Sequence, residues 1–360
     1  MAGNTFGEAV RLTTFGESHG VALGGVLEGL PAGLTVDWAD VQADVARRRP
    51  GQSRLTTPRQ EADEVECLSG IFEGKTTGAP IGFVIRNSNA KPSDYDHIKE
   101  TFRPSHADYT YTTKYGFRDH RGGGRASARE TVSRVVGGAL ARQWLRTMGV
   151  EVGAFVERAG DVAMAGGAGW FDRSIVDASP TRCPDPETAA AMTTAIEAAR
   201  RAGDTLGGSV VCVARGVPAG WGEPVFDKLH AVLAHALFSL PAVKGVEFGS
   251  GFAGTFLSGS AHNDAFVPGL PGEVRTATNR SGGIQGGISN GEDIVLRVGF
   301  KPVATIRATQ ASVDSEGRPV EVVGKGRHDP CVLPRAVPLV EAMALLALAD
   351  AAQRARMNRL

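Results

Sequence analysis

The chain has 360 residues, of which 39 are Lys or Arg and 39 are Asp or Glu, so its formal net charge is zero. This length excludes a peptide or a disulfide-stapled miniprotein, and it predicts about two domains or one large domain. The bulk charge indicates neither a nucleic-acid nor a membrane partner. Glycine is unusually frequent, at 47 residues, which a folded protein uses for turns and for close approach of the backbone.

Hydrophobic periodicity predicts the secondary structure in chain order. The first helix is expected over 37–47, where Val41 and Val45 are four residues apart. A strand, a turn and a second strand are expected over 70–85. The later predictions are a helix over 126–148, a helix over 184–201 within an insertion at 184–203, a strand over 209–215, a helix over 224–240, a strand over 294–300 and an amphipathic helix over 335–355. Because no linker divides the chain, residues 1–360 are predicted to form one domain of α and β structure.

Cysteine spacing and the chain's first residues indicate the cytoplasm. The four cysteines have neither zinc-ligand spacing nor the density of a disulfide framework, so no metal site is expected: Cys67, Cys183, Cys212 and Cys331. Residues 1–10 lack the basic flank and apolar run of a signal peptide. The apolar segment 337–352 contains Glu341 and Asp350, and it is too short and too charged to span a bilayer.

Arginines without counter-charges predict an anion site. The segment 47–59 contains five of them and no acidic residue: Arg47, Arg48, Arg49, Arg54 and Arg59. Cations this close repel one another, so an anionic ligand would stabilise them. A solvated helix end is the alternative, and the chain's bias toward arginine (31, against 8 lysines) accounts for part of the pattern.

A second basic cluster lies beside a glycine turn. The cluster comprises Arg103, Arg118, Arg121, Arg125 and Arg129, with His106 and His120. Residues 122–124 are all glycine and enter a predicted helix, so backbone N–H groups there could approach a phosphate. The spacing is not the dinucleotide fingerprint, because Ser127 stands where its third glycine would fall. A packed glycine turn is the alternative.

Two segments resemble catalytic or nucleotide-binding motifs but do not support those functions. The segment 70–76 (GIFEGKT) has three residues between its glycines where a P-loop needs four, so a hairpin turn is favoured. The segment 16–20 (GESHG) matches a nucleophile elbow, but the fifteen residues before it are too few to build the required sheet. A serine hydrolase acting through Ser18 is therefore disfavoured.

Three histidine-containing segments were weighed for proton transfer. His19, flanked by Gly16 and Gly20, is a candidate proton donor beside a large ligand. His230 and His235 lie on an apolar helix and are interpreted as packing or surface residues. The loop 324–331 brings Arg327, His328 and Asp329 together between glycines and a proline, a pattern typical of a cleft, although a polar turn is the alternative.

Taken together, these segments resemble the chorismate synthase family. Six motifs match in order: 14–20 (TFGESHG), 47–54 (RRRPGQSR), 102–109 (FRPSHADY), 121–131 (RGGGRASARET), 282–289 (GGIQGGIS) and 326–332 (GRHDPCV). The resemblance implies an α+β fold, a β-α-β sandwich with helices packed between antiparallel sheets, and assembly as a homotetramer. It also implies a lyase that converts 5-enolpyruvylshikimate 3-phosphate to chorismate and phosphate by 1,4-anti elimination. The family requires reduced FMN without net oxidation or reduction.

The same resemblance assigns roles to individual residues. It implies substrate binding by Arg48, Arg54, Arg103 and Arg129, proton donation to the departing phosphate by His19, contact of His106 with reduced flavin, and proton handling near flavin N5 by Asp329. It implies flavin binding by Arg125, Ala126, Ser127, Pro241, Ala242, Gly286, Lys301, Pro302, Val303, Ala304, Thr305 and Arg327. Many relatives have hydroxyl residues at Val303 and Ala304 and asparagine at Pro241, so backbone contacts are expected to substitute here.

The sequence and the resemblance also predict the protein's partners and the source of its electrons. Some relatives reduce FMN with NADPH, but no separate reductase domain is visible in this sequence, so an external flavin reductant is expected. A protein that binds RNA or another polyanion could use the same arginines. Zero net charge and 6% aromatic residues argue against that alternative, and neither a nucleic-acid nor a membrane partner is predicted.

Overall fold

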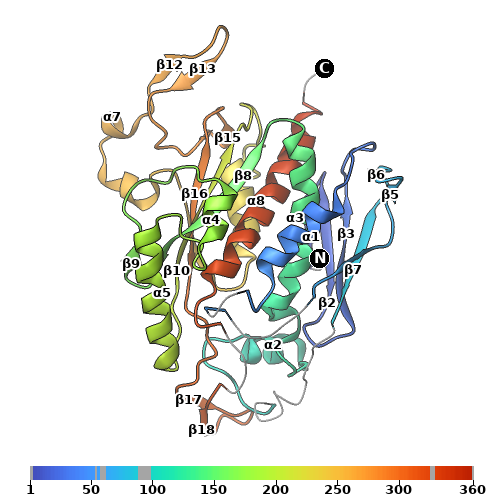
Figure 1. Ribbon diagram of the computed structural model, residues 1–360, viewed down its shortest axis with the longest axis vertical. Helices are drawn as coiled ribbons and strands as arrows, with labels where there is room; N and C mark the ends of the chain where they lie inside the picture. The colour runs from blue at the N-terminus through green and yellow to red at the C-terminus, as the bar shows by residue number, and fades with distance from the viewer. Residues whose placement is uncertain (1–2, 53–54, 57–61, 88–98, 325–328, 359–360) are drawn as a thin grey trace.

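The computed structural model describes residues 3–52, 55–56, 62–87, 99–324 and 329–358. Within these residues, two five-stranded antiparallel sheets face each other with helices between them (Figure 1). The predicted α+β sandwich is therefore confirmed. The strands outside the two sheets form small hairpins: β5 (Ile71–Phe72) with β6 (Lys75–Thr76), β12 (Phe266–Pro268) with β13 (Val274–Thr276), β14 (Ile284–Gln285) with β15 (Ile288–Ser289), and β17 (Gln310–Val313) with β18 (Pro319–Val322).

Alternating burial turns one face of the first sheet toward the helices. Its strands, in spatial order, are β1 (Thr5–Phe6), β2 (Arg11–Gly16), β3 (Ala22–Glu28), β7 (Ile81–Arg86) and β4 (Val65–Cys67). In β7, every second side chain is buried, namely Ile81, Phe83 and Ile85. This is the two-residue period of a strand with one covered face. The predicted strand, turn and strand over 70–85 correspond to β5, β6 and β7.

The second sheet is covered on both faces at its centre. Its strands, in spatial order, are β11 (Val243–Phe248), β16 (Ile294–Phe300), β10 (Gly208–Arg215), β8 (Glu151–Ala159) and β9 (Val162–Ala163). In β10, Val210 and Cys212 join the main core, while Val211 and Val213 pack with Phe155 in a smaller outer core. Burial on both faces explains why β10 reads as a continuous apolar run.

The helices divide into an inner and an outer set. The inner helices are α1 (Trp38–Arg48), α3 (Thr131–Arg146), α6 (Leu229–Phe238) and α8 (Leu333–Ala355), and the outer ones include α4 (Arg173–Ala178) and α5 (Pro186–Arg201) (Figure 1). α3 and α8 are in very close contact, because a Cβ at Gly138 would lie 2.5 Å from Cα of Ala342. The short helix α2 (Asp108–Tyr115) lies at one end of the sandwich.

Three predicted helices differ from the structure. α3 begins at residue 131 because two 3₁₀ turns, η2 (Gly124–Ala126) and η3 (Ala128–Glu130), occupy its predicted first turns. α6 begins at residue 229 because Glu223 and Asp227 form an isolated bridge instead. The amphipathic character predicted for α8 is wrong, since residues 333–352 are all buried. The segment 337–352, predicted to be too short and too charged to span a bilayer, lies within α8, which by length and composition could cross one. In this protein, 94% of the most apolar window of α8 is buried.

A buried ion-pair network links the inner helices to the second sheet. Glu341 of α8 accepts hydrogen bonds from Arg47 Nη1 at 2.5 Å and from Arg142 Nη2 at 3.0 Å. It also accepts one from the Ala154 amide of β8 at 3.3 Å. Arg142 bonds in addition to Asp44 of α1. One carboxylate thus connects α1, α3, α8 and β8 in the core.

The last helix also secures the start of the chain. Asp350 of α8 is 2% exposed, and its Oδ1 accepts hydrogen bonds from the amides of Glu8, Ala9 and Val10 at 3.0, 2.6 and 2.9 Å. These residues form the turn between β1 and β2. The turn therefore needs a side chain that comes about 340 residues later in the chain.

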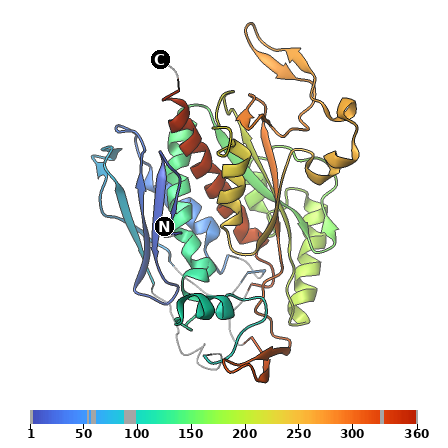
Figure 2. The ribbon, with the colours of Figure 1, turned by 180° about the vertical axis from the view of Figure 1, so that it is seen from behind.

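An arm projects from the second sheet (Figure 2). It comprises η4 (Gly251–Phe256), α7 (Gly259–His262) and the β12–β13 hairpin. Its large side chains lie on the surface, namely Phe252, Phe256, Phe266, Leu270 and Val274, of which Phe256 is 89% exposed. Exposed apolar patches of this kind commonly mark contact surfaces.

Removing the charge at the centre of the ion-pair network should destabilise the fold. We expect Glu341→Gln to lower the free energy of unfolding by about 3 kcal/mol, because it leaves buried guanidinium groups without their partner. Burial opposes ionisation of Glu341, but Arg47 and Arg142 outweigh it and lower the pKa to about 2. The stabilisation is therefore present above pH 4.5 and is lost as the pH falls toward 2. Urea unfolding over this pH range measures both effects.

The matched control is Glu151→Gln. Glu151 pairs with Arg215 at 2.5 Å, but both side chains are more than 40% exposed, so the pair is screened by water. Equal losses of stability for the two variants would contradict the structural role of Glu341.

Candidate active site

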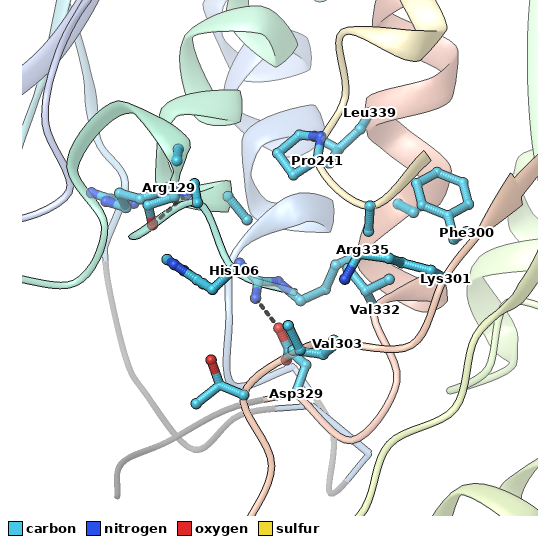
Figure 3. Close-up of a pocket in the computed structure, with 18 of the residues that line it drawn as sticks. His106, Arg129, Pro241, Phe300, Lys301, Val303, Asp329, Val332, Arg335 and Leu339 are labelled. Carbon is cyan, nitrogen blue, oxygen red and sulfur yellow. Dashed lines mark hydrogen bonds and ion pairs between the residues drawn. The ribbon is translucent and has the colours of Figure 1, made fainter. Parts of the chain in front are cut away.

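A cleft of about 370 Å³ lies where the inner helices end. It is bounded by the last turn of α1, the η3 turn before α3, the first turns of α8 and three loops (Figure 3). The residues in its lining that the sequence analysis assigned to substrate, flavin or catalysis are Arg48, Arg103, His106, Ala126, Ser127, Arg129, Pro241, Ala242, Lys301, Val303, Ala304, Thr305 and Asp329. Segments from four distant parts of the chain thus meet here.

Arg48 is the most deeply buried cation of the cleft, at 1% exposure. Its Nη2 donates to the Ala128 carbonyl at 2.6 Å, and its Nη1 pairs with Asp63 at 3.2 Å. Burial, together with the charges of Arg335 and Arg129, lowers the pKa of Arg48 to about 9 against the opposing effect of Asp63. The charged form is therefore disfavoured by its surroundings, and a bound anion would stabilise it.

One buried carboxylate connects two of the predicted substrate arginines. Asp63 is 2% exposed, and it pairs with Arg48 through Oδ2 and with Arg129 through Oδ1. Arg48 ends α1, whereas Arg129 belongs to η3, so the two guanidinium groups reach the cleft from different elements. Asp63 fixes their relative position.

A second buried carboxylate, Asp108, connects the remaining predicted side chains on this side of the cleft. Asp108 pairs with Arg103 at 2.8 Å, with His106 Nδ1 at 2.9 Å and with Arg118 at 3.3 Å. Burial opposes its ionisation, but the hydrogen bonds from Arg103 and His106 outweigh that effect and hold the pKa of Asp108 well below its ordinary value. Asp108 is therefore a carboxylate at neutral pH.

The third carboxylate, Asp329, lies in the lining itself. It pairs with Arg335 Nη1 at 2.5 Å, and Arg335 Nε donates to the Arg48 carbonyl at 3.1 Å (Figure 3). Arg335 stands in the first turn of α8. This turn therefore anchors both Asp329, the predicted proton carrier, and Arg48 at the end of α1.

The cleft has more cations than carboxylates. Its lining contains five permanent cations and one carboxylate, namely Arg48, Arg103, Arg129, Lys301, Arg335 and Asp329. Asp63 and Asp108 lie behind this lining, which leaves two positive charges without counting the histidines. In a partly buried site, this excess favours a small ligand with several negative charges.

The side of the cleft opposite His106 and Arg129 is apolar. Figure 3 shows Pro241, Phe300 and Leu339 there, with Lys301 beside them. An apolar wall beside a cation suits a planar ring that carries an anionic tail. The residues present thus fit a flavin, whose ring would lie on the wall and whose phosphate would need a cation.

The triple glycine turn separates His19 from the cleft. Gly122 lines the cleft with a φ of +73°, and a Cβ there would lie 2.3 Å from Cε1 of His19. Only glycine accommodates both the left-handed backbone and this contact. His19 is 9% exposed, and its Nδ1 lies 3.1 Å from Ser18 Oγ. Its imidazole is therefore held directly behind the wall of the cleft.

Some predicted residues lie elsewhere. The Arg125 guanidinium bonds to Thr14 Oγ1 at 2.8 Å and to the Gly16 carbonyl at 3.1 Å, and it lines a neighbouring cavity of about 880 Å³. Gly286 lies in the β14–β15 turn, and Pro302 is exposed beside the cleft. Arg54 and Arg327 lie outside the described residues, as does His328.

The partners of the predicted residues were not predicted from the sequence. Asp63, Asp108 and Arg335 hold the cationic side chains in place, and none was singled out for this role. A signal was present for Arg335, since an arginine in the first turn of a long apolar helix must have a buried partner. Asp63 offered no comparable signal, because only the folded chain brings it between Arg48 and Arg129.

The fold and the cleft together define an α+β sandwich enzyme for a small polyanion. Comparisons with known proteins agree with that class. Residues 10–353 match the family described as chorismate synthase. The chain is 59% identical over 350 residues to the "Chorismate synthase" of Christiangramia forsetii, covering 97% of each chain, and 56% identical over 347 residues to that of Parabacteroides distasonis, covering 96% of this chain and 97% of the relative.

A solved structure agrees as well. The one titled "Crystal Structure of Chorismate Synthase" superposes with a TM-score of 0.76 at 30% identity, and the match covers 96% of this chain and 92% of that one. The chain belongs to the chorismate synthase family. The resemblance inferred from the six motifs is thus confirmed.

Filling the space beside His19 should disturb the site without unfolding the protein. We expect Gly122→Ala to lower catalytic turnover about 100-fold, because the added methyl group displaces the imidazole by an ångström or more. Steady-state kinetics would measure the loss, and a thermal melt would report the accompanying strain of the left-handed residue.

Gly74→Ala is the matched control, because Gly74 has a φ of +74° but nothing within 4 Å of its added Cβ. Both variants should lose similar stability from backbone strain. Normal turnover in Gly122→Ala, or an equal loss in Gly74→Ala, would contradict the role of this contact.

Proposed function

We propose that the cationic cleft is the active site in which this chain converts 5-enolpyruvylshikimate 3-phosphate to chorismate and phosphate. The chain is a lyase of the shikimate pathway, which supplies aromatic amino acid biosynthesis. In the 1,4-anti elimination, the bond between C3 and the phosphate oxygen breaks and a proton leaves C6. The observation that carries the proposal is the cleft's excess of two positive charges, which favours a substrate with several anionic groups, here one phosphate and two carboxylates.

Arginines hold the substrate's anionic groups in this proposal. Arg48, Arg103 and Arg129 face the cleft, and each keeps a buried carboxylate behind it. Guanidinium groups supply paired hydrogen bonds to phosphate and carboxylate, and preorganised cations stabilise charge that develops as phosphate departs. Arg54 is proposed to join them on the strength of the family resemblance.

His19 lies outside the lining, directly behind Gly122, and on the family resemblance it is proposed to donate a proton to the departing phosphate. Its ring lies against Gly122, so the phosphate is proposed to bind at the glycine-turn end of the cleft, near Arg129. Backbone N–H groups of a glycine turn also favour an anion at this position. The chain thereby orients the leaving group and neutralises its charge.

Reduced FMN is the proposed cofactor, and it supplies electron density that eases the loss of phosphate and is recovered when the C6 proton leaves. The cleft residues proposed to hold it are Ala126, Ser127, Pro241, Ala242, Lys301, Val303, Ala304 and Thr305. Arg125, Gly286, Pro302 and Arg327 are proposed on the family resemblance alone. Where the hydroxyl groups of relatives are missing, at Val303 and Ala304, backbone groups make the polar contacts.

Two side chains handle protons beside the flavin. With flavin bound, His106 would contact the reduced ring, and Asp329 would take up the proton that leaves the substrate. The pairing of Asp329 with Arg335 at 2.5 Å holds the carboxylate in a fixed position.

Turnover should require both the reduced flavin and these three side chains. Under anaerobic conditions with reduced FMN, we expect His19→Ala, His106→Ala and Asp329→Ala each to lower kcat at least about 100-fold, because each removes a proton donor or acceptor. Chorismate absorbance measures turnover, and circular dichroism should show an unchanged fold.

His230→Ala serves as the control, since His230 packs on Phe248 of β11 rather than lining the cleft. Turnover under oxidising conditions without flavin would overturn the proposal. Substrate-independent binding to RNA that weakens steeply with salt and ignores flavin would favour the polyanion-binding alternative.

The protein is proposed to assemble as a homotetramer. The projecting arm exposes Phe252, Phe256 and Phe266 together, and a second copy of this chain would cover them. Burying such aromatic side chains is a common source of association energy.

Light scattering tests the assembly. We expect a mass of about 150 kDa, four times the 37.6 kDa of one chain, and a smaller species for the double variant Phe256→Ser, Phe266→Ser. Phe72→Ser is the control, because Phe72 is 68% exposed on β5, in the separate β5–β6 hairpin. A single-chain mass for the unmodified protein would contradict the proposal.

The protein is further proposed to act in the cytoplasm with an external flavin reductant. Cys183, Cys212 and Cys331 are buried free thiols, which supports a reducing compartment. Among the described residues, the sandwich, the arm, the hairpins and the loops include no separate reductase domain. This supports reduction of FMN by another protein. Neither a nucleic acid nor a membrane is a proposed partner.

A further inference from the structure

We infer that Asp108 is a positioning residue that fixes the tautomer of His106 and orients Arg103 in the same rigid unit. The inference rests on the proposed function for the role of His106 at the flavin. It concerns a side chain outside the lining of the substrate cleft that acts through its two neighbours.

Both oxygens of Asp108 are used. Oδ1 lies 2.9 Å from His106 Nδ1 and accepts from Arg103 Nη2 at 2.8 Å. Oδ2 accepts from Arg103 Nε at 2.8 Å and from the Arg103 amide at 3.1 Å. Arg103 thus makes a two-pronged contact that holds its guanidinium plane, and the carboxylate is 3% exposed.

The chemistry of these donors determines the histidine tautomer. An ionised carboxylate can only accept hydrogen bonds, so the hydrogen between Asp108 and His106 must be on Nδ1. A neutral imidazole with a hydrogen on Nδ1 has a lone pair on Nε2. The nitrogen that faces away from Asp108 is therefore set to accept a hydrogen bond or a proton.

The glycine turn leaves that edge of the ring accessible. A Cβ at Gly123 would lie 3.2 Å from Cε1 and 3.5 Å from Nε2 of His106. Gly123 also has a φ of +101°, so its lack of a side chain serves both the backbone and the imidazole. Because His106 lines the cleft, its accessible nitrogen can meet a ligand there.

Asp108 is not explained by its place in the helix. It stands in the first turn of α2, but the residue that caps this helix is Ala107, and no side chain caps it. Arg118 adds a third cation at 3.3 Å. A carboxylate that collects Arg103, His106 and Arg118 matches the way an orienting carboxylate serves a catalytic histidine.

Nitrogen NMR of the unliganded protein tests the tautomer directly. With ¹⁵N-labelled histidine, and with His106→Gln to assign the signal, we expect His106 in the unmodified protein to carry its hydrogen on Nδ1. In Asp108→Asn, one accepting oxygen becomes an NH₂ group. This group can donate to Nδ1, which should move the hydrogen to Nε2, and it also removes an acceptor from Arg103. Asp108→Glu keeps an acceptor and should keep the original tautomer.

Kinetics test the consequence. We expect Asp108→Asn to lower kcat at least about tenfold and to raise KM for the substrate, because His106 and Arg103 both lose their partner. Asp119→Asn is the matched control, since Asp119 pairs with the exposed Arg121 at 2.6 Å. Binding of oxidised FMN, followed by its fluorescence, supplies a readout independent of turnover.

The outcomes separate the two proposals. His106 with its hydrogen on Nε2 in the unmodified protein would overturn the inference, even if Asp108→Asn fails to fold. So would an Asp108→Asn variant whose tautomer, FMN affinity and kcat all match those of Asp119→Asn. Failure of the proposed function would appear instead as absent turnover in the unmodified protein, while its NMR signals still report the tautomer.

Discussion

Burying guanidinium groups where carboxylates are too few is the constraint on which this structure depends. A buried charge without a partner is costly, and here Asp63, Asp108 and Asp329 offset only part of the positive charge that faces the cleft. The three carboxylates hold the cations in position, and the remaining excess is left for the ligand. The same arrangement therefore supplies both the geometry of the site and its preference for anions.

Two consecutive arginines show how closely the fold and the site are connected. Arg47 bonds to Glu341 in the core network, whereas Arg48 turns toward Asp63 and the cleft. Both stand in the last turn of α1, about 100° apart around the helix. A disturbance of the core network would therefore move the end of α1 and, with it, a substrate-binding side chain.

Much of the fold could be predicted from the sequence, because its elements have strong local patterns. The strand over 294–300 and the helix at 186–201 follow from periodicity and a helix-starting proline. α8 could not be recognised as buried on all sides, because its few charged residues suggested a side that faces solvent. Those charged residues find their partners only through tertiary contacts. The start of α3 was missed because the glycine turn and two 3₁₀ turns obey no helical period.

For the site, the motifs indicated the cations and the structure supplied their partners. Thirteen of the residues that the family resemblance assigned to substrate, flavin or catalysis line one cleft. Local sequence carries no information on which carboxylate will meet which arginine, so Asp63 and Arg335 were found only in the folded chain. Arg125 belongs to one of the six motifs, and its guanidinium bonds to Thr14 of β2, a contact that the motif does not predict.

The bond between Asp350 and the turn after β1 has a consequence for synthesis on the ribosome. The nascent chain emerges from its N-terminus, yet the amides of residues 8–10 find their acceptor only in the final helix. The amides of this turn thus lack their acceptor until residue 350 has been synthesised. The contacts of the sandwich with α8 can therefore form only after that helix has left the exit tunnel.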